Sequence, residues 1–298
     1  MEHNLAPLRN DPRSFNTKTQ KNRRKLVNKI IIYTVIFIGL TLFLFPVYWM
    51  VAASLQPNSE LIKSPPSIVP SRLTFSSYLN IFTNPRFRPY FKNSGIVSFS
   101  TVTLNLFFSI LAGYSFSRFR FWGRTGVMTA ILSVQMFPRV AILIVLFGLF
   151  TTLKLTNSYI GLVLGHLTFT MPFSIWFLKS FFDGIPYELE EAALIDGANR
   201  FQILFKIVVP LATPGIISVL IYTFLLSWND FMYAFTLVTK DELRTLPVGI
   251  ALTFIGEYQF DWSGMMALAT LTTLPVIILF IFLQRYMIAG LTQGALKG

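Results

Sequence analysis

The sequence contains no cysteine and is poor in charged residues. The missing thiols exclude a disulfide framework and any metal or nucleophilic site built on cysteine. The two histidines, His3 and His166, are too far apart in the chain to suggest a metal pair, and we interpret His166 as a helix-packing residue. Charged residues make up 13 % of the chain and hydrophobic residues 53 %. This balance excludes a soluble globular protein.

A Gly-Lys dipeptide is also missing. The phosphate-binding loop of ATPases requires this pair, because its lysine reaches the nucleotide phosphates. We therefore expect no ATP hydrolysis and no cofactor in this chain. A membrane enzyme would need paired carboxylates or a ligand cluster, and Glu188, Glu190 and Glu191 superficially provide one. Their place in the first turns of a predicted helix, where the dipole favours acidic residues, explains them better.

The main positive feature of the sequence is a series of long apolar stretches. A transmembrane helix needs roughly 20 apolar residues to cross about 30 Å of hydrocarbon. The sequence thus predicts an all-α membrane protein with six transmembrane helices. The first window is too long for the apolar core of a cleavable signal peptide. The predicted spans cover residues 30–54, 94–114, 126–149, 159–180, 211–237 and 264–287.

The formal charge of +12 is explained by membrane topology. No basic stripe with interleaved aromatic residues indicates a nucleic-acid partner. Lysine and arginine concentrate in the segments that would be cytoplasmic if the amino terminus lies inside, so both termini are predicted to be cytoplasmic. Residues 1–28 are predicted to be a disordered basic leader, and 29–298 to form the membrane domain.

The predicted cytoplasmic loop 181–210 contains residues that typically begin and end two short helices. Pro186 suits the first position of a helix of about ten residues, and Gly197 can close it in a left-handed conformation. Asn199 can cap a second helix, with Gln202 at the reciprocal position, and this helix would run to Pro210. An ordinary amphipathic connector would have the same general features.

The order of residues in this loop is more specific. Glu191-Ala192-Ala193 is followed after three residues by Gly197, and after nine more by Ile207-Val208-Val209-Pro210. This pattern resembles the EAA motif of permeases in binding-protein-dependent ABC importers, with Val209 where leucine is usual.

Four other segments are similar to the maltose-type, carbohydrate branch of that family. The resemblance covers nearly the whole chain after the leader and implies the type I ABC importer permease fold. The similar segments are Ala112–Arg118, Gln135–Pro138, Trp228–Phe231 and Gln284–Gly298.

The resemblance also implies partners in a bacterial cytoplasmic (inner) membrane. These are a second homologous permease, a dimer of cytoplasmic ABC ATPase that binds ATP and Mg, and an extracytoplasmic sugar-binding protein. The predicted ATPase-coupling residues are Glu190, Glu191, Ala192, Ala193, Asp196, Gly197 and Pro210. The glycine-rich tail would add a carboxy-terminal ATPase contact through Gly294, Lys297 and Gly298.

Two ionisable residues lie inside predicted spans, where a charge costs at least about 2.5–3.5 kcal/mol. Arg139 follows Pro138 in the third span and Asp230 lies in the fifth. Two interpretations are open: they line a sugar pathway, or they pair with each other or with backbone carbonyls and so fix helix packing. A cationic pathway residue raises the hypothesis of an acidic saccharide as cargo. The pathway candidates are Gln135, Arg139, Trp228, Asn229 and Asp230.

The alternative function is an ATP-independent secondary transporter of a polar solute. Such a protein is expected to carry coupling-ion carboxylates in several spans, whereas Asp230 is the only clear one here. An internal repeat, which many secondary transporters contain, is not recognisable in the sequence either.

Overall fold

The computed structural model describes residues 12–63, 67–254 and 261–295, and within these ranges the chain is helical without a β-strand. Five long helices form the frame: α1 (Pro12–Ser54), α4 (Phe87–Arg118), α7 (Tyr159–Asp183), α11 (Thr213–Trp228) and α14 (Trp262–Ala295). The shorter helices are α2 (Asn58–Leu61), α3 (Ser76–Thr83), α5 (Arg124–Ser133), α6 (Arg139–Thr152), α8 (Glu188–Ile195), α9 (Arg200–Ile203), α10 (Val209–Leu211), α12 (Met232–Leu237) and α13 (Leu246–Phe254).

The prediction of six spans is confirmed if two bent helix pairs each count as one span. Four unbroken helices are long and apolar enough to cross a bilayer by themselves. The pair from Arg124–Met136 to Arg139–Thr152 bends by 103°, and the pair from Arg200–Leu211 to Thr213–Trp228 bends by 80°.

The third and fifth predicted spans are not single straight helices, and the break within the fifth lies at residues 229–231, separate from the 80° bend at Ala212. In the third, Pro138 has an extended backbone and cannot donate the hydrogen bond that would continue the helix, so α5 and a short 3-10 turn end and α6 begins at Arg139. The fifth was predicted to run to Leu237, but α11 ends at Trp228 and a non-helical link leads into α12.

The prediction of a disordered leader is wrong for residues 12–28. These residues extend α1 towards the amino terminus, and residues 1–11 lie outside the described part. Nucleation is the costly step of helix formation, and the apolar span already provides it. The leader's Lys, Arg and Gln residues are good helix formers and can propagate the helix from there.

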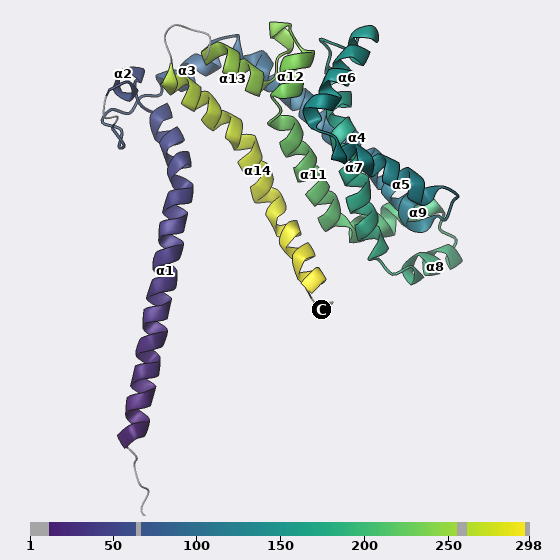
Figure 1. Cartoon of the computed structure of the whole chain (residues 1–298), viewed down its shortest axis with the longest axis horizontal. Helices are drawn as coiled ribbons and strands as arrows, with labels where there is room; N and C mark the ends of the chain where they lie inside the picture. The colour runs from purple at the N-terminus through teal and green to yellow at the C-terminus, as the bar shows by residue number, and fades with distance from the viewer. Residues whose placement is uncertain (1–11, 64–66, 255–260, 296–298) are drawn as a thin grey trace, which may run out of the picture.

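Helix α1 stands apart from the bundle for most of its length and meets it only near its carboxyl end (Figure 1). None of the most apolar part of α1 is buried, whereas Ala52, Ala53 and Ser54 at its end are. Its main partner is α14.

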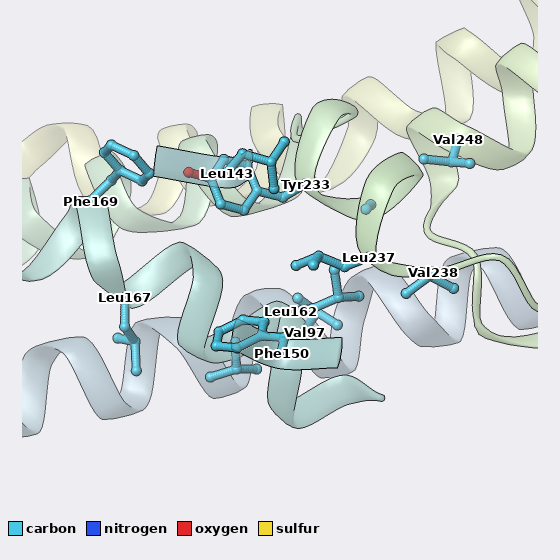
Figure 2. Packing of buried hydrophobic residues seen from close by; sticks show 12 residues of the cluster. Val97, Leu143, Phe150, Leu162, Leu167, Phe169, Tyr233, Leu237, Val238 and Val248 are labelled. Carbon is cyan, nitrogen blue, oxygen red and sulfur yellow. The ribbon is translucent and has the colours of Figure 1, made fainter. Parts of the chain in front are cut away.

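The core lies among the remaining helices in three clusters of buried side chains. One joins α4, α6, α7, α12 and α13 through residues such as Val97, Leu162 and Leu237 (Figure 2). A second surrounds Phe224 and Trp228 between α3, α4, α11 and α14. The third joins α4 and α7 to the segment that follows α8. All three clusters contain residues of α4, which makes it the central helix.

A buried polar group fixes the centre of this bundle. The side-chain amide of Asn105 in α4 donates to Ser174 Oγ of α7 at 2.8 Å and to Thr223 Oγ1 of α11 at 2.7 Å. All three residues are fully buried. Hydrogen bonds between helices have few competitors inside a bilayer, so this contact fixes the register of three spans.

The two ends of the bundle differ in what they carry. Figure 1 shows α8, α9, the start of α1 and the end of α14 at one end of the molecule, and α2, α3, α12 and α13 at the other. Helix α1 thus begins, and helix α14 ends, on the side of the molecule that carries α8. This arrangement is compatible with an even number of spans.

Candidate transport pathway and coupling surface

The breaks in the third and fifth spans meet at the side chain of Tyr233. This residue lies in α12, directly after the break in the fifth span, and its hydroxyl donates to the carbonyl oxygen of Arg139 at 3.3 Å. Its buried ring packs edge-on against Phe169 of α7, with centroids 5.6 Å apart (Figure 2). Two interrupted helices and one continuous helix therefore converge on a single tyrosine.

Arg139 is the first residue of α6, immediately after the break, and its side chain is exposed. The guanidinium carbon lies 5.5 Å from the ring centroid of Phe169, within the range of a cation–π contact. Gln135, on the other side of the break, is also exposed, although its side-chain amide donates to the Phe169 carbonyl oxygen at 2.7 Å. Both pathway candidates of the third span thus lie on an open surface beside an aromatic ring.

Asp230 has a different role from the pairing with Arg139 considered above. Its Oδ2 lies 3.3 Å from His166 Nε2, and its two carboxylate oxygens accept the backbone N–H groups of Tyr233 and Ala234 at the start of α12. The Nδ1 atom of His166 lies 3.0 Å from Ser227 Oγ. The carboxylate therefore caps α12 and ties it to α7, and His166 is a packing histidine, as predicted.

Trp228 and Asn229 differ in their exposure to the surroundings. The indole of Trp228 is buried, stacks on Phe224 with centroids 5.3 Å apart, and donates to the Thr272 carbonyl oxygen at 3.1 Å. This contact joins α11 to α14 and leaves no ring face open. Asn229 is exposed at the break. Among the five pathway candidates, Gln135, Arg139 and Asn229 are thus exposed, whereas Trp228 and Asp230 hold the structure together.

The loop between α7 and α11 folds partly as its residues predict: α8 has eight residues and begins at Glu188, with Pro186 before it and not at its first position. Helix α8 ends before Gly197, whose φ of +84° is the left-handed conformation that the pattern required. Asn199 and Gln202 form the expected reciprocal capping box at the start of α9. Pro210 does not end the second helix, because a π-helical turn over Leu204–Val208 leads through α10 instead.

Most predicted coupling residues lie on an open face of α8. Glu191, Ala192 and Asp196 are exposed, and Ala193 is half-buried. The same face carries exposed apolar side chains, including Leu189 at 45 % and Ile195 at 87 %. An exposed apolar surface on a helix of eight residues is typical of a protein-binding site.

Glu190 is the exception, because it is fully buried. Its carboxylate accepts hydrogen bonds from Tyr114 and Arg118 at the end of α4. The tail residues give no comparable information, since Gly294 lies in the last turn of α14 and Lys297 and Gly298 fall outside the described residues.

Sequence reasoning did not single out Tyr233, Phe169, Tyr114 or Arg118 for these roles. The first two are aromatic residues in apolar stretches, which are ordinarily core residues. Tyr114 and Arg118 appeared only within the family-like segment Ala112–Arg118. A tyrosine four residues before an arginine at the end of a span was the available signal, because both then lie on one face of a helix.

An all-α chain with up to six membrane spans, in which the break after Pro138 meets the link between α11 and α12 at Tyr233, has the architecture of a membrane-embedded transport component. The sequence pattern of the family described as "Binding-protein-dependent transport system inner membrane component" matches residues 105–293. The chain belongs to this family.

Relatives and a solved structure agree with this assignment. The chain is 38 % identical to the inner membrane ABC transporter permease protein YcjP of Escherichia coli, over 93 % of this chain and 99 % of the relative. It is 34 % identical to the trehalose/maltose transport system permease protein MalG of Thermococcus litoralis, over the same shares. A bacterial ABC transporter involved in the import of the acidic polysaccharide alginate has a similar fold, with a TM-score of 0.78 at 23 % identity, covering 89 % of this chain and 98 % of that one. The chain is therefore a multi-pass inner-membrane permease subunit of an ABC transporter, and not an enzyme.

Proposed function

We propose that this permease imports an oligosaccharide along a path that passes the two interrupted spans. The meeting of the break after Pro138 and the link between α11 and α12 at Tyr233 carries the proposal, because interrupted helices leave backbone and polar groups available at membrane depth, where they line cavities. The name of the trehalose/maltose relative supports a saccharide cargo.

The exposed residues at the breaks have the chemistry that a sugar requires. Gln135 and Asn229 offer amide groups for hydroxyls, and Arg139 offers a guanidinium. Phe231 and Phe235 stack on each other with centroids 5.3 Å apart, and both remain exposed. Apolar ring faces beside a few hydrogen-bonding groups are the usual composition of a small-molecule site.

The charge of Arg139 extends the proposal to an acidic saccharide. Inside a membrane a cation is costly, so an anionic group on the cargo would compensate it during passage. Replacing Arg139 with alanine is expected to abolish import of a uronate oligomer, whereas Arg139→Lys retains part of it. Uptake of radiolabelled acidic and neutral oligosaccharides by the two variants measures this difference. Neutral sugars imported undiminished by Arg139→Ala, with no acidic sugar held by the binding protein, would contradict it.

Helix α8 is proposed to be the contact through which an ATPase drives the movement of this permease. Its exposed apolar side chains and its acidic residues Glu191 and Asp196 form a surface that fits a groove in a separate cytoplasmic ATPase, which would bind ATP and Mg. The end of α14, with Gly294, Lys297 and Gly298 beyond or near it, would add a second contact. Both termini would then be cytoplasmic, and the binding protein would approach the opposite end.

The most exposed helix suggests a second permease subunit as the remaining partner. Among the residues that the structure describes, none of the most apolar part of α1 is buried. Lipid covers part of such a surface, and a homologous subunit that completes the pathway would cover the rest.

The test is ATP hydrolysis by this chain reconstituted in lipid with its neighbouring permease and ATPase, with and without loaded binding protein. The native complex is expected to be stimulated by the loaded protein, and Gly197→Asp to lose the stimulation while remaining assembled. A chain that co-purifies with no ATPase, or transport that continues without ATP, would favour a secondary transporter.

A further inference from the structure

The side chain of Glu190 faces into the protein, away from the exposed surface of α8. It is the one buried residue of this helix. Oε2 accepts a hydrogen bond of 2.8 Å from the Tyr114 hydroxyl, and Oε1 accepts one of 2.5 Å from Arg118 Nε. Arg200 at the start of α9 places Nη1 4.0 Å from Oε2. A carboxylate with these partners is unavailable to another protein.

Arg118 binds the connection before α8 as well as α8 itself. Its Nη2 donates to the Ile185 carbonyl oxygen at 3.0 Å, just after the end of α7. The neighbouring Ser117 hydroxyl donates to Asp183 at 2.7 Å. The last turn of α4 is therefore bound both to the end of α7 and to α8, with the Arg118 side chain only 8 % exposed.

Aromatic rings shield this group from water. Tyr114 packs edge-on against Phe119 and Phe182, with centroids 6.0 and 6.3 Å away. Low polarity strengthens the attraction between the charged groups, and it also makes the loss of either partner costly, because the other is left buried and uncompensated. The contact is thus rigid while intact.

We infer that Glu190 is a positioning residue that locks α8 to α4, so that a displacement of α8 moves the second span directly. The inference rests on the proposed coupling role of α8. From α4 the movement reaches α7 and α11 through the amide of Asn105, which contacts both helices near the centre of the bundle. Arg200 links the same carboxylate to the start of the fifth span.

The experiment uses the full complex in proteoliposomes and compares Glu190→Gln with Glu188→Gln. Glu188 lies on the same helix, is exposed, and serves as the matched control. The readouts are ATPase subunits retained, ATP hydrolysed and sugar imported. The Glu190→Gln complex is expected to keep its ATPase and to hydrolyse ATP, but to import about tenfold less sugar per ATP, a loss typical of broken coupling between distant sites. The Glu188→Gln complex should match the native one.

Tyr114→Phe provides a milder variant, since it removes only the hydroxyl that binds Oε2. It should lower the import per ATP in the same direction and to a smaller extent. An unchanged ratio in both variants would overturn the inference. So would loss of the ATPase from Glu190→Gln alone, because Glu190 would then act on docking. If the native complex itself imports nothing, the proposed function fails, and that result is distinct from either.

Discussion

At the scale of single residues, the buried indole of Trp228 joins two spans. Its Nε1 donates to Thr272 of α14, and its ring stacks on Phe224. Trp228→Phe keeps an aromatic ring but removes the hydrogen bond to the Thr272 carbonyl, which is expected to cost about 0.5–1.5 kcal/mol of stability. The midpoint of thermal aggregation in detergent should fall, while the preference among sugars stays the same.

Trp122 provides the control for this prediction, because it is fully exposed at 101 %. Trp122→Phe should leave the midpoint unchanged. A changed sugar preference in Trp228→Phe would show that the indole contacts the cargo after all.

Gly197 is the other residue whose identity is set by backbone geometry. Its φ is +84°, and an added Cβ would meet nothing within 4 Å, so only the conformation limits substitution. A left-handed alanine costs roughly 1–2 kcal/mol, whereas asparagine tolerates this region better. Gly197→Ala should lower the ATP hydrolysis stimulated by the loaded binding protein, and Gly197→Asn should lower it less.

Gly126→Ala is the matched control for Gly197. An added Cβ there also meets nothing within 4 Å, and the residue lies in helix α5, where alanine is favoured. Equal losses of stimulated hydrolysis in Gly126→Ala and Gly197→Ala would contradict the conformational explanation.

At the scale of elements, α13 approaches α4 so closely that it requires a glycine. An added Cβ on Gly249 would lie 2.3 Å from the buried ring of Tyr90, whose hydroxyl is held by Asp241 at 3.1 Å. Gly249→Ala should therefore destabilise the protein by about 1–3 kcal/mol through overpacking, measured as a lower thermal midpoint. Gly95→Ala on α4, where nothing lies within 4 Å, should have no such effect.

The elements also show how far the sequence alone could predict this fold. Apolar length is a local property, and the six spans followed from it. Capping residues also act locally, so the capped loop between α7 and α11 could be predicted as well. The breaks did not, because a proline inside a span is compatible with a modest kink as well as with the 103° bend seen at Pro138. Which of these forms depends on contacts from other spans, such as the bond from Tyr233 to the Arg139 carbonyl. The burial of Glu190 likewise depends on the distant residues Tyr114 and Arg118.

At the scale of the whole molecule, the absence of cysteine allows a direct test of orientation. Single cysteines can be placed at Asp196, near α8, and at Lys240, near α12, two exposed positions at opposite ends of the bundle (Figure 1). A membrane-impermeant maleimide added to intact spheroplasts should label Lys240→Cys, and label Asp196→Cys only after the membrane is opened. The opposite pattern would place the termini outside. The unmodified chain should remain unlabelled throughout.

The isolation of α1 has a consequence for how the protein is made. This helix satisfies its backbone hydrogen bonds internally, and the spans that follow bury little of its surface. It can therefore insert into the membrane and remain stable there before the later spans are synthesised. The later spans carry Asn105, His166 and Asp230, whose polar atoms find partners only on one another's helices or at their ends. These spans therefore depend on one another for their polar contacts inside the bilayer, whereas α1 does not depend on them.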